Sequence, residues 1–498
     1  MKFTLEHIAK YLLYIFLIVF PFNLVVGKIF PSLVSLPFFI ADCILLFCGI
    51  IVIIYLIRKQ MQFEKEQYII VGSSVLFILL GIITIITHFS LIKQFILTHD
   101  IQENIFLTFK QIISRHVVQS IAQTLHTVLG LVLFIFVLQI SVKKEQIIKI
   151  LCIPLIIILV INLGLAIFQQ DVSLDGGMVD SFITPYQLSE TGRIYFPFVN
   201  SLLLSCYLSC MLFLVFYLFI TTKKQHLLFG LGFLLFITIF IFGLTKGRIA
   251  ILFTFLLSIM LFCRLYLKKT PFPKLITIGL LIFLFCLTIH SFLFHNNSFV
   301  DFIDKLTLEK NNSTISQTTS VTQEIKSLPL TSPKSSSQTI QKELEKTLET
   351  QYNDFNKNLF FTHWQTALVL FEHAPVLGVG TGLFYYSVTQ SHKDILCEIK
   401  TLCPSTMQAT DLSSTAHNIY LQILAEQGVI GIFIFITILV YLVYFFLQNK
   451  EDIFVLCLGM SIFCFLLQGL TFSYFAYPEM LYLFFLLLGL YCKKDKKK

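Results

Sequence analysis

Apolar stretches of about twenty residues recur along this chain from its beginning to its end. A helix needs roughly 20 apolar residues to cross a hydrocarbon core about 30 Å thick. The interior of a water-soluble domain cannot account for these runs, because 56% of the 498 residues are apolar and only 13% are charged. We therefore expect an all-α fold, a polytopic membrane bundle of about twelve transmembrane helices.

The first apolar run is expected to remain as a helix of the protein. No small-residue cleavage site follows it and a second span comes at once, which argues against a signal peptide. The candidate spans are residues 11–27, 35–57, 68–87, 120–140, 148–168, 198–221, 226–244, 249–267, 274–294, 428–447, 452–471 and 477–492.

Lysine and arginine are concentrated in alternate connections between these spans. The clusters are Arg58, Lys59 and Lys65; Lys143, Lys144 and Lys149; Lys223 and Lys224; Arg264, Lys268, Lys269 and Lys274; Lys450; and the tail 493–498. Because such residues mark cytoplasmic loops, we expect both termini in the cytoplasm. The net charge of +8 is thereby explained by topology and not by a nucleic-acid partner.

The remaining connections, 88–119, 169–197 and 295–427, are then long outer loops. The sequence predicts an N-terminal bundle of about nine helices over 1–294, an extracytoplasmic loop domain over 295–427, and C-terminal helices with a basic cytoplasmic tail over 428–498. This places a large loop between the ninth and tenth helices. Its segment 311–341 is rich in Ser, Thr, Gln and Lys, so we expect it to be mobile.

Ten of the twelve cysteines fall in or beside predicted spans. A thiol there is a small apolar packing group. Cys397 and Cys403 are different, because both lie in the predicted outer loop. An oxidising compartment would permit a disulfide between them, whereas a reducing one would not.

Three cations stand in connections predicted to face outward, where the positive-inside rule disfavours them. Lys246 and Arg248 occupy the short connection between two spans, and Arg193 lies among acidic residues just before another. A guanidinium binds phosphate through two parallel hydrogen bonds, so an anionic ligand would explain Arg248. Lipid phosphate at the interface is the alternative for this pair, and a local ion pair is the alternative for Arg193.

Polar residues recur where the chain re-enters the membrane near residue 418. Asn418, Gln422 and Glu426 are spaced by four residues and share one helix face, directly after His417. A histidine at the mouth of a wet cavity can exchange a proton near neutral pH, although a helix cap is an equal explanation. Asp42 is a further candidate because it lies inside a span, where it either serves function or bonds a neighbouring helix.

Two absences limit the chemistry. Gly378, Gly380 and Gly382 resemble a nucleotide loop only superficially, since no βαβ unit surrounds them, and a turn that needs small residues is expected instead. The sequence also lacks the paired-aspartate DxD spacing that holds a divalent metal on a sugar diphosphate. We therefore expect no metal and no cofactor, with arginines taking the place of the cation.

Several segments together resemble the O-antigen ligase and polymerase superfamily over roughly residues 193–445. They are Leu244-Thr245-Lys246-Gly247-Arg248, His363-Trp364 followed by Pro375 to Gly382, Ala416-His417-Asn418-Ile419-Tyr420-Leu421, and Glu426-Gln427-Gly428-Val429-Ile430-Gly431. The segment Gly192 to Asn200 looks like the family's other arginine loop, but departs from its small, glycine-containing form after Arg193.

The resemblance implies transfer of a glycan from an undecaprenyl-diphosphate carrier to an acceptor on the outer face of the bacterial cytoplasmic membrane. In that family two arginines bind the diphosphate and a histidine assists the reaction, which here correspond to Arg193, Arg248 and His417. The implied partners are the lipid-linked donor, membrane lipid, and a glycan, lipid or protein acceptor. We expect a metal-independent, inverting ligase; a polymerase and a protein O-oligosaccharyltransferase share the same motifs.

Two functions of other classes compete with this hypothesis. A flippase for lipid-linked sugars is one, because about twelve helices is a common transporter size, although transporters hold substrate near the midplane and show internal repeats. A sensor or scaffold is the other, and it would leave Arg248 and His417 free to change.

Overall fold

The computed structural model describes residues 5–23, 40–58, 61, 63–98, 103–168, 195–198, 200–245, 247–267, 274, 278–279, 282, 363–384 and 415–493. All regular structure within these ranges is helical, which confirms the all-α class. Residues 1–285 and 363–498 form one compact unit, and everything below concerns the described part of that unit.

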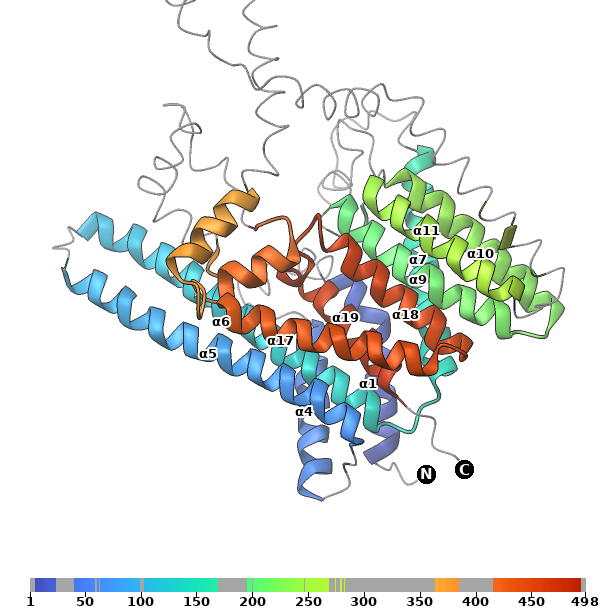
Figure 1. The fold of residues 1–498 in the computed structure, drawn as a ribbon, viewed down its shortest axis with the longest axis horizontal. Helices are drawn as coiled ribbons and strands as arrows, with labels where there is room; N and C mark the ends of the chain where they lie inside the picture. Colours follow the sequence, from blue (N-terminus) through green and yellow to red (C-terminus); the bar gives the residue numbers. More distant parts are fainter. Residues whose placement is uncertain are drawn as a thin grey trace, which may run out of the picture. The chain divides into compact units, whose positions relative to one another are not determined.

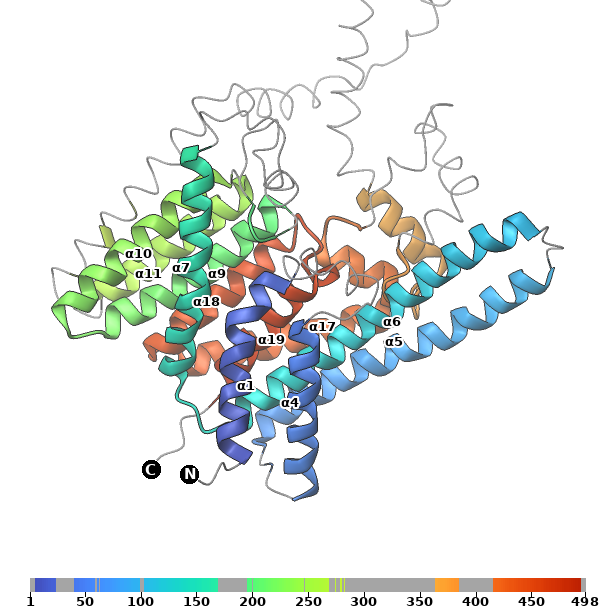
Figure 2. The same cartoon turned by 180° about the vertical axis from the view of Figure 1, so that it is seen from behind.

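The helices of this unit are shown in Figures 1 and 2. They are α1 (Leu5–Val19), η1 (Phe20–Phe22), α4 (Ile40–Ile57), α5 (Lys65–Thr98), α6 (Glu103–Gln139), α7 (Lys144–Phe168), α9 (Ser201–Thr221), α10 (Gln225–Leu244), α11 (Arg248–Leu267), α17 (Ile419–Asn449), α18 (Ile453–Gln468), η5 (Tyr474–Ala476) and α19 (Pro478–Cys492). A further helix covers residues 363–373.

Within the described residues, eight helices are long and apolar enough to cross a membrane, which makes this a multi-pass membrane protein. The shorter apolar helices are Gln67–Ile83, Ile453–Gln468 and Pro478–Cys492. Every one of these segments coincides with a predicted span. The predicted span 274–294 falls almost wholly outside the described residues, so the number twelve stays a prediction.

The prediction of a loop over residues 88–119 is wrong. Helix α5 continues to Thr98 and α6 begins at Glu103, so nearly all of this stretch is helical. The two helices run side by side in both views of the bundle (Figures 1 and 2). The physical reason is that 88–119 contains polar residues but no glycine or proline to end a helix.

Helix α9 is the centre of the bundle, with all of residues 203–220 buried. It packs against α7, α10, α11 and α18. Small polar side chains allow the close approach of α18: Gln468 donates to Ser209 Oγ at 2.7 Å, and Ser461 Oγ donates to the Cys210 carbonyl at 2.9 Å. Such interhelical hydrogen bonds contribute about 0.6 kcal/mol each on average in a membrane bundle.

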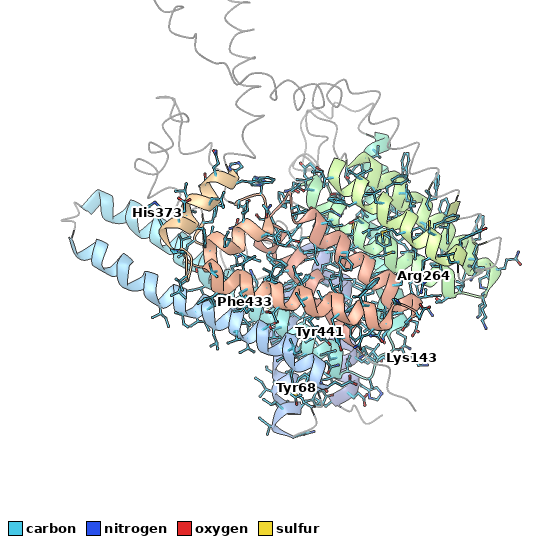
Figure 3. The ribbon with its side chains drawn as sticks, viewed as in Figure 1. Tyr68, Lys143, Arg264, His373, Phe433 and Tyr441 are labelled. Carbon is cyan, nitrogen blue, oxygen red and sulfur yellow. The ribbon has the colours of Figure 1, made fainter. Side chains whose placement is uncertain are left out.

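The peripheral helices have a lipid-facing and an interior side. On α17, Phe433 is 69% exposed whereas Tyr441 is 6% exposed (Figure 3). The cysteines follow the predicted packing role: all nine that the structure describes are free thiols and seven are buried. Cys397 and Cys403 lie outside the described residues, so their pairing is untested.

Cations from the connections predicted to be cytoplasmic lie at helix C-terminal ends. Lys493 Nζ donates to the carbonyls of Val137 and Ile140 at 2.7 and 2.5 Å, and Lys274 Nζ donates to those of Ile220 and Thr222 at 2.5 and 2.9 Å. Ammonium groups satisfy the unpaired carbonyls there and interact favourably with the helix dipole. These contacts define one end of the bundle, which we call the basic end.

Candidate functional site

His417 stands directly before α17 in an unusual backbone conformation. Its φ of 50° lies in the left-handed region, which a residue with a side chain seldom adopts. The following residue fixes the turn: Asn418 Oδ1 caps the helix by accepting from the amides of Tyr420 and Leu421 at 2.9 and 3.0 Å. Ser473 Oγ accepts from the Asn418 amide at 3.1 Å, which ties the turn to the α18–α19 connection.

The ring of His417 packs against a second histidine. The centroids of His363 and His417 are 5.0 Å apart with an interplanar angle of 31°, and Phe472 meets His417 edge-on at 5.4 Å. His363 is 3% exposed. Burial, and secondarily the neighbouring His417, lowers the pKa of His363 to about 4; burial also lowers the pKa of His417. Both imidazoles are therefore neutral at pH 7, and each can accept a proton.

His363 was not predicted as a site residue, although its His-Trp pair is part of the motif pattern. Sequence spacing gives no sign of the pairing, because 54 positions separate residue 363 from residue 417. Besides that motif, the sequence offered only a histidine preceding an apolar helical stretch in a predicted outer loop.

The predicted polar face of α17 is buried and internally bonded. Gln422 Oε1 accepts from the Ala416 amide at 2.6 Å, and its amide nitrogen donates to Glu426. Glu426 Oε2 in turn accepts from the Gly382 amide at 2.9 Å. These side chains hold the segments on either side of His417 in place.

A cavity of about 50 Å³ lies beside this polar face, between α5, α6, α17 and α19. Its polar lining consists of Ser74, Gln123, Thr127, Thr381, Gln422, Glu426, Gln427 and Ser473. The space and the polar groups suit a few water molecules, since one water needs roughly 10–15 Å³ of such volume.

Residues 378–382 form turns that pack against a break in α17. This confirms the predicted turn of small residues. Gly378, Gly380 and Gly382 have φ of 70°, 110° and 72°, and Gly428 breaks the helix with φ of 61°. The amides of Val379 and Gly380 donate to the carbonyls of Ala425 and Glu426, both at 2.9 Å.

The opposite side of the break is satisfied in the same way, because the Val429 amide donates to the Pro375 carbonyl at 2.9 Å. Backbone groups freed inside the bundle are thus paired with the loop, as the low-dielectric interior demands.

Arg248 and His417 belong to the same end of the bundle, opposite the basic end. Helix α11 begins at Arg248, and Thr254 near its start contacts Cys464 near the end of α18 at 3.2 Å. The Ile419 amide donates to the Gly469 carbonyl at 2.7 Å, so α17 also begins beside the end of α18. The side chain of Arg248 and the whole of Lys246 and Arg193 lie outside the described part of the chain.

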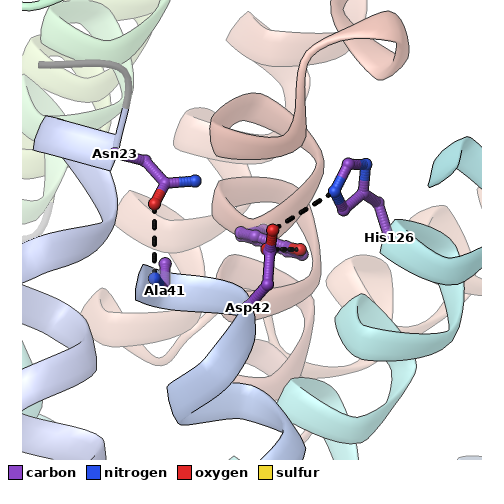
Figure 4. Close-up of polar contacts among 5 residues, drawn as sticks. Asn23, Ala41, Asp42 and His126 are labelled. Atoms are coloured by element: carbon purple, nitrogen blue, oxygen red, sulfur yellow. Dashed lines mark hydrogen bonds and ion pairs between the residues drawn. The ribbon is translucent and has the colours of Figure 1, made fainter. Parts of the chain in front are cut away.

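Asp42 lies in the interior between α4, α6 and α19 (Figure 4). It is fully buried, accepts a hydrogen bond from Tyr482, and its Oδ2 lies 3.4 Å from His126 Nε2. Nearby, Asn23 Oδ1 accepts from the Ala41 amide at 3.3 Å. The group links three helices, which favours the prediction that Asp42 bonds its neighbours.

Residues 233–436 match the family model for O-antigen ligase. This region of the chain is similar to the O-antigen ligase family. The O-antigen ligase region begins in α10, contains Arg248, both histidines and the glycine turns, and ends in α17 beyond Gly428. The family is one of glycan-processing membrane enzymes of the ligase and polymerase type. Arg193 and Asp42 lie outside the matched region, and no curated protein matches the chain.

Proposed function

We propose that the protein transfers a glycan from an undecaprenyl-diphosphate carrier to an acceptor at the outer face of the bacterial inner membrane. The observation that carries this is the pair Arg248 and His417: a partly buried, neutral histidine and an arginine at a helix start belong to one bundle end inside the O-antigen ligase region. Both termini would then be cytoplasmic, as the basic end supports.

The chemistry requires charge stabilisation and a base. Breaking the bond between sugar and diphosphate places positive charge on the anomeric carbon and negative charge on the departing lipid diphosphate. Arg248, with Arg193 and Lys246, would bind that diphosphate, aided by the amides at the start of α11. Losing one preorganised donor of this kind costs on the order of 3 kcal/mol, a hundredfold or more in rate.

His417 would remove the proton of the acceptor hydroxyl. Its lowered pKa favours the neutral form, which is the form a general base needs. Attack of the activated hydroxyl on the face opposite the leaving diphosphate inverts the anomeric carbon. We propose that this step is metal-independent, since cationic side chains can neutralise the diphosphate. The predicted outer loop 295–427 would carry the acceptor side of the site.

The test uses purified protein in detergent with an undecaprenyl-diphosphate glycan and candidate lipid, glycan and protein acceptors. We expect Arg248→Ala and His417→Ala each to lower glycan transfer at least about a hundredfold. Arg264→Ala is the matched control, because Arg264 pairs with Glu451 near the basic end and should transfer normally. Addition of a chelator should leave the wild-type rate unchanged.

Different outcomes point to different functions. Transfer that survives in both variants would remove the assigned roles of Arg248 and His417. If the wild type transferred to no acceptor but moved lipid-linked sugar across vesicles, the protein would be a flippase and the proposal would be wrong. The acceptor that is glycosylated distinguishes ligase, polymerase and protein glycosylation.

A further inference from the structure

We infer that His363 is a positioning residue for His417: its buried ring holds the base in the orientation that proton removal requires and shields one side of it from water. This rests on the proposed function, in which His417 acts as the base. His363 itself touches no reacting atom in this assignment.

The geometry gives the His417 ring two packing partners. His363 lies against it with centroids 5.0 Å apart and a tilt of 31°, and Phe472 closes a second side edge-on at 5.4 Å. The left-handed backbone of His417 sets the direction of the side chain. A ring packed on two sides loses little freedom when substrate binds, which is how preorganised groups gain rate.

The two histidines stand on segments that share one apolar cluster. Ala367 and Leu370, on the helix that begins at His363, pack with Ala416, the residue before His417, and with Ala425. The backbones that carry both rings are therefore anchored to the same core. Displacement of one ring relative to the other would require this cluster to open.

The partial burial of His417 also favours its unprotonated form. The neighbouring titratable groups do not oppose this effect: Phe472 is flanked by Tyr474 and Tyr477 at 5.2 and 5.6 Å, and burial raises the pKa of both tyrosines. On α17, Glu426 is engaged by Gln422 and the Gly382 amide. Opening the space that His363 fills would admit water, and hydration would raise the pKa of His417.

The experiment compares His363→Ala with His363→Phe, which removes the imidazole but keeps an aromatic ring. We expect His363→Ala to lower kcat about tenfold to a hundredfold, with the donor KM within about twofold, because the diphosphate is bound elsewhere. The acid limb of the kcat–pH profile of His363→Ala should move upward toward pH 6.5. His363→Phe should retain kcat within about threefold and the low acid limb, since the ring contact is preserved.

His373→Ala is the matched control, because this exposed histidine lies at the other end of the same helix (Figure 3). A readout independent of transfer is the NMR titration of His417, assigned through His417→Ala. Its pKa should rise in His363→Ala and stay low in His363→Phe. If His363→Ala does not fold, the kcat and the His417 pKa of His363→Phe are compared with those of the wild type. A large change in either would contradict the inference.

Three results would overturn the inference. An unchanged kcat in His363→Ala would show that the ring contact is unimportant for transfer. A His363→Phe variant as slow as His363→Ala would assign the imidazole a direct chemical role. A His417 pKa unchanged in His363→Ala would mean that His363 does not control its surroundings. If Arg248→Ala and His417→Ala lose transfer while His363→Ala keeps the wild-type kcat, the inference fails but the proposed function stands.

Discussion

Across the break in α17, Gly378 lies against the main chain of Glu426 and Gln427, and Gly428 lies against that of Pro375 and Val376. A Cβ on Gly378 would lie 2.2 Å from the carbonyl carbon of Glu426, and one on Gly428 would lie 2.4 Å from the Val376 carbonyl oxygen. Both residues also have positive φ, of 70° and 61°. The loop and the broken helix can approach closely enough to exchange hydrogen bonds only if neither position has a side chain.

Alanine at either glycine should destabilise the protein. A non-glycine residue at positive φ costs about 1–3 kcal/mol, and the contacts with backbone atoms cannot relax as a flexible side chain would. We expect a lower midpoint of thermal unfolding in detergent for Gly378→Ala and Gly428→Ala. Because His417 and the glycine turns are tied together through Gln422 and Glu426, transfer should fall as well.

Gly164→Ala provides the matched comparison. No atom lies within 4 Å of a Cβ added there, and the residue is inside α7, where alanine favours the helix. Its thermal midpoint should be equal to or above that of the wild type. Equal midpoints for Gly428→Ala and Gly164→Ala would contradict the close contact across the break.

Removal of Asp42 should cost more than removal of the hydroxyl that it binds. Asp42→Ala removes the acceptor of the Tyr482 hydroxyl and the carboxylate beside His126 in a buried site, a loss of about 3 kcal/mol. Tyr482→Phe removes one hydrogen bond, about 1 kcal/mol. Unfolding by a denaturing detergent, followed for both variants, would rank them. The reverse order would show that Asp42 contributes nothing to stability beyond its bond with Tyr482.

Transfer should persist below pH 6.5. The ordinary histidine pKa is 6.5 and burial lowers that of His417, so its neutral form remains the major one as the pH falls through that value. The acid limb of kcat, measured from pH 4.5 to 9 with saturating donor, should therefore lie below 6.5. A limb centred at or above 6.5 would indicate a fully hydrated base, contrary to a ring that His363 and Phe472 partly cover.

The buried Gln468 should matter more to stability than the exposed pair near the basic end. Gln468 is 1% exposed and bonds both Ser209 and Tyr474, so Gln468→Ala removes two buried hydrogen bonds, which costs about 1–2 kcal/mol. Arg264→Ala breaks an ion pair with Glu451, whose side chain is 68% exposed. This change should cost less than about 1 kcal/mol. Thermal unfolding of both variants checks the order, and a larger effect of Arg264→Ala would refute it.

The sequence predicted the spans well because each carries its own apolar run, and a helix in lipid satisfies its backbone within itself. It failed over 88–119, where helices without glycine or proline contain enough polar residues to resemble a loop. The glycine turns were predicted, but their docking onto Ala425 and Glu426 was not, since contact between distant segments leaves no periodic signal.

The candidate site could be predicted only residue by residue. His417 stood out by its place before a polar helix face, whereas its packing on His363 depends on the fold of two distant segments. The predicted roles of Arg193, Lys246 and the side chain of Arg248 stay predictions, as does the loop domain 295–427 with its insert 311–341.

The burial of α9 over residues 203–220 has a consequence for how the protein is made. During synthesis α9 emerges before α10, α11 and α18, three of the helices that surround it, so it must first reside in lipid without them. Ser205 and Ser209 donate to the carbonyls of Leu202 and Cys206, each at 2.8 Å, within the helix itself. The hydroxyl hydrogens of these two serines are thus already paired when the helix meets the acyl chains, and Gln468 can later join Ser209 as an additional donor.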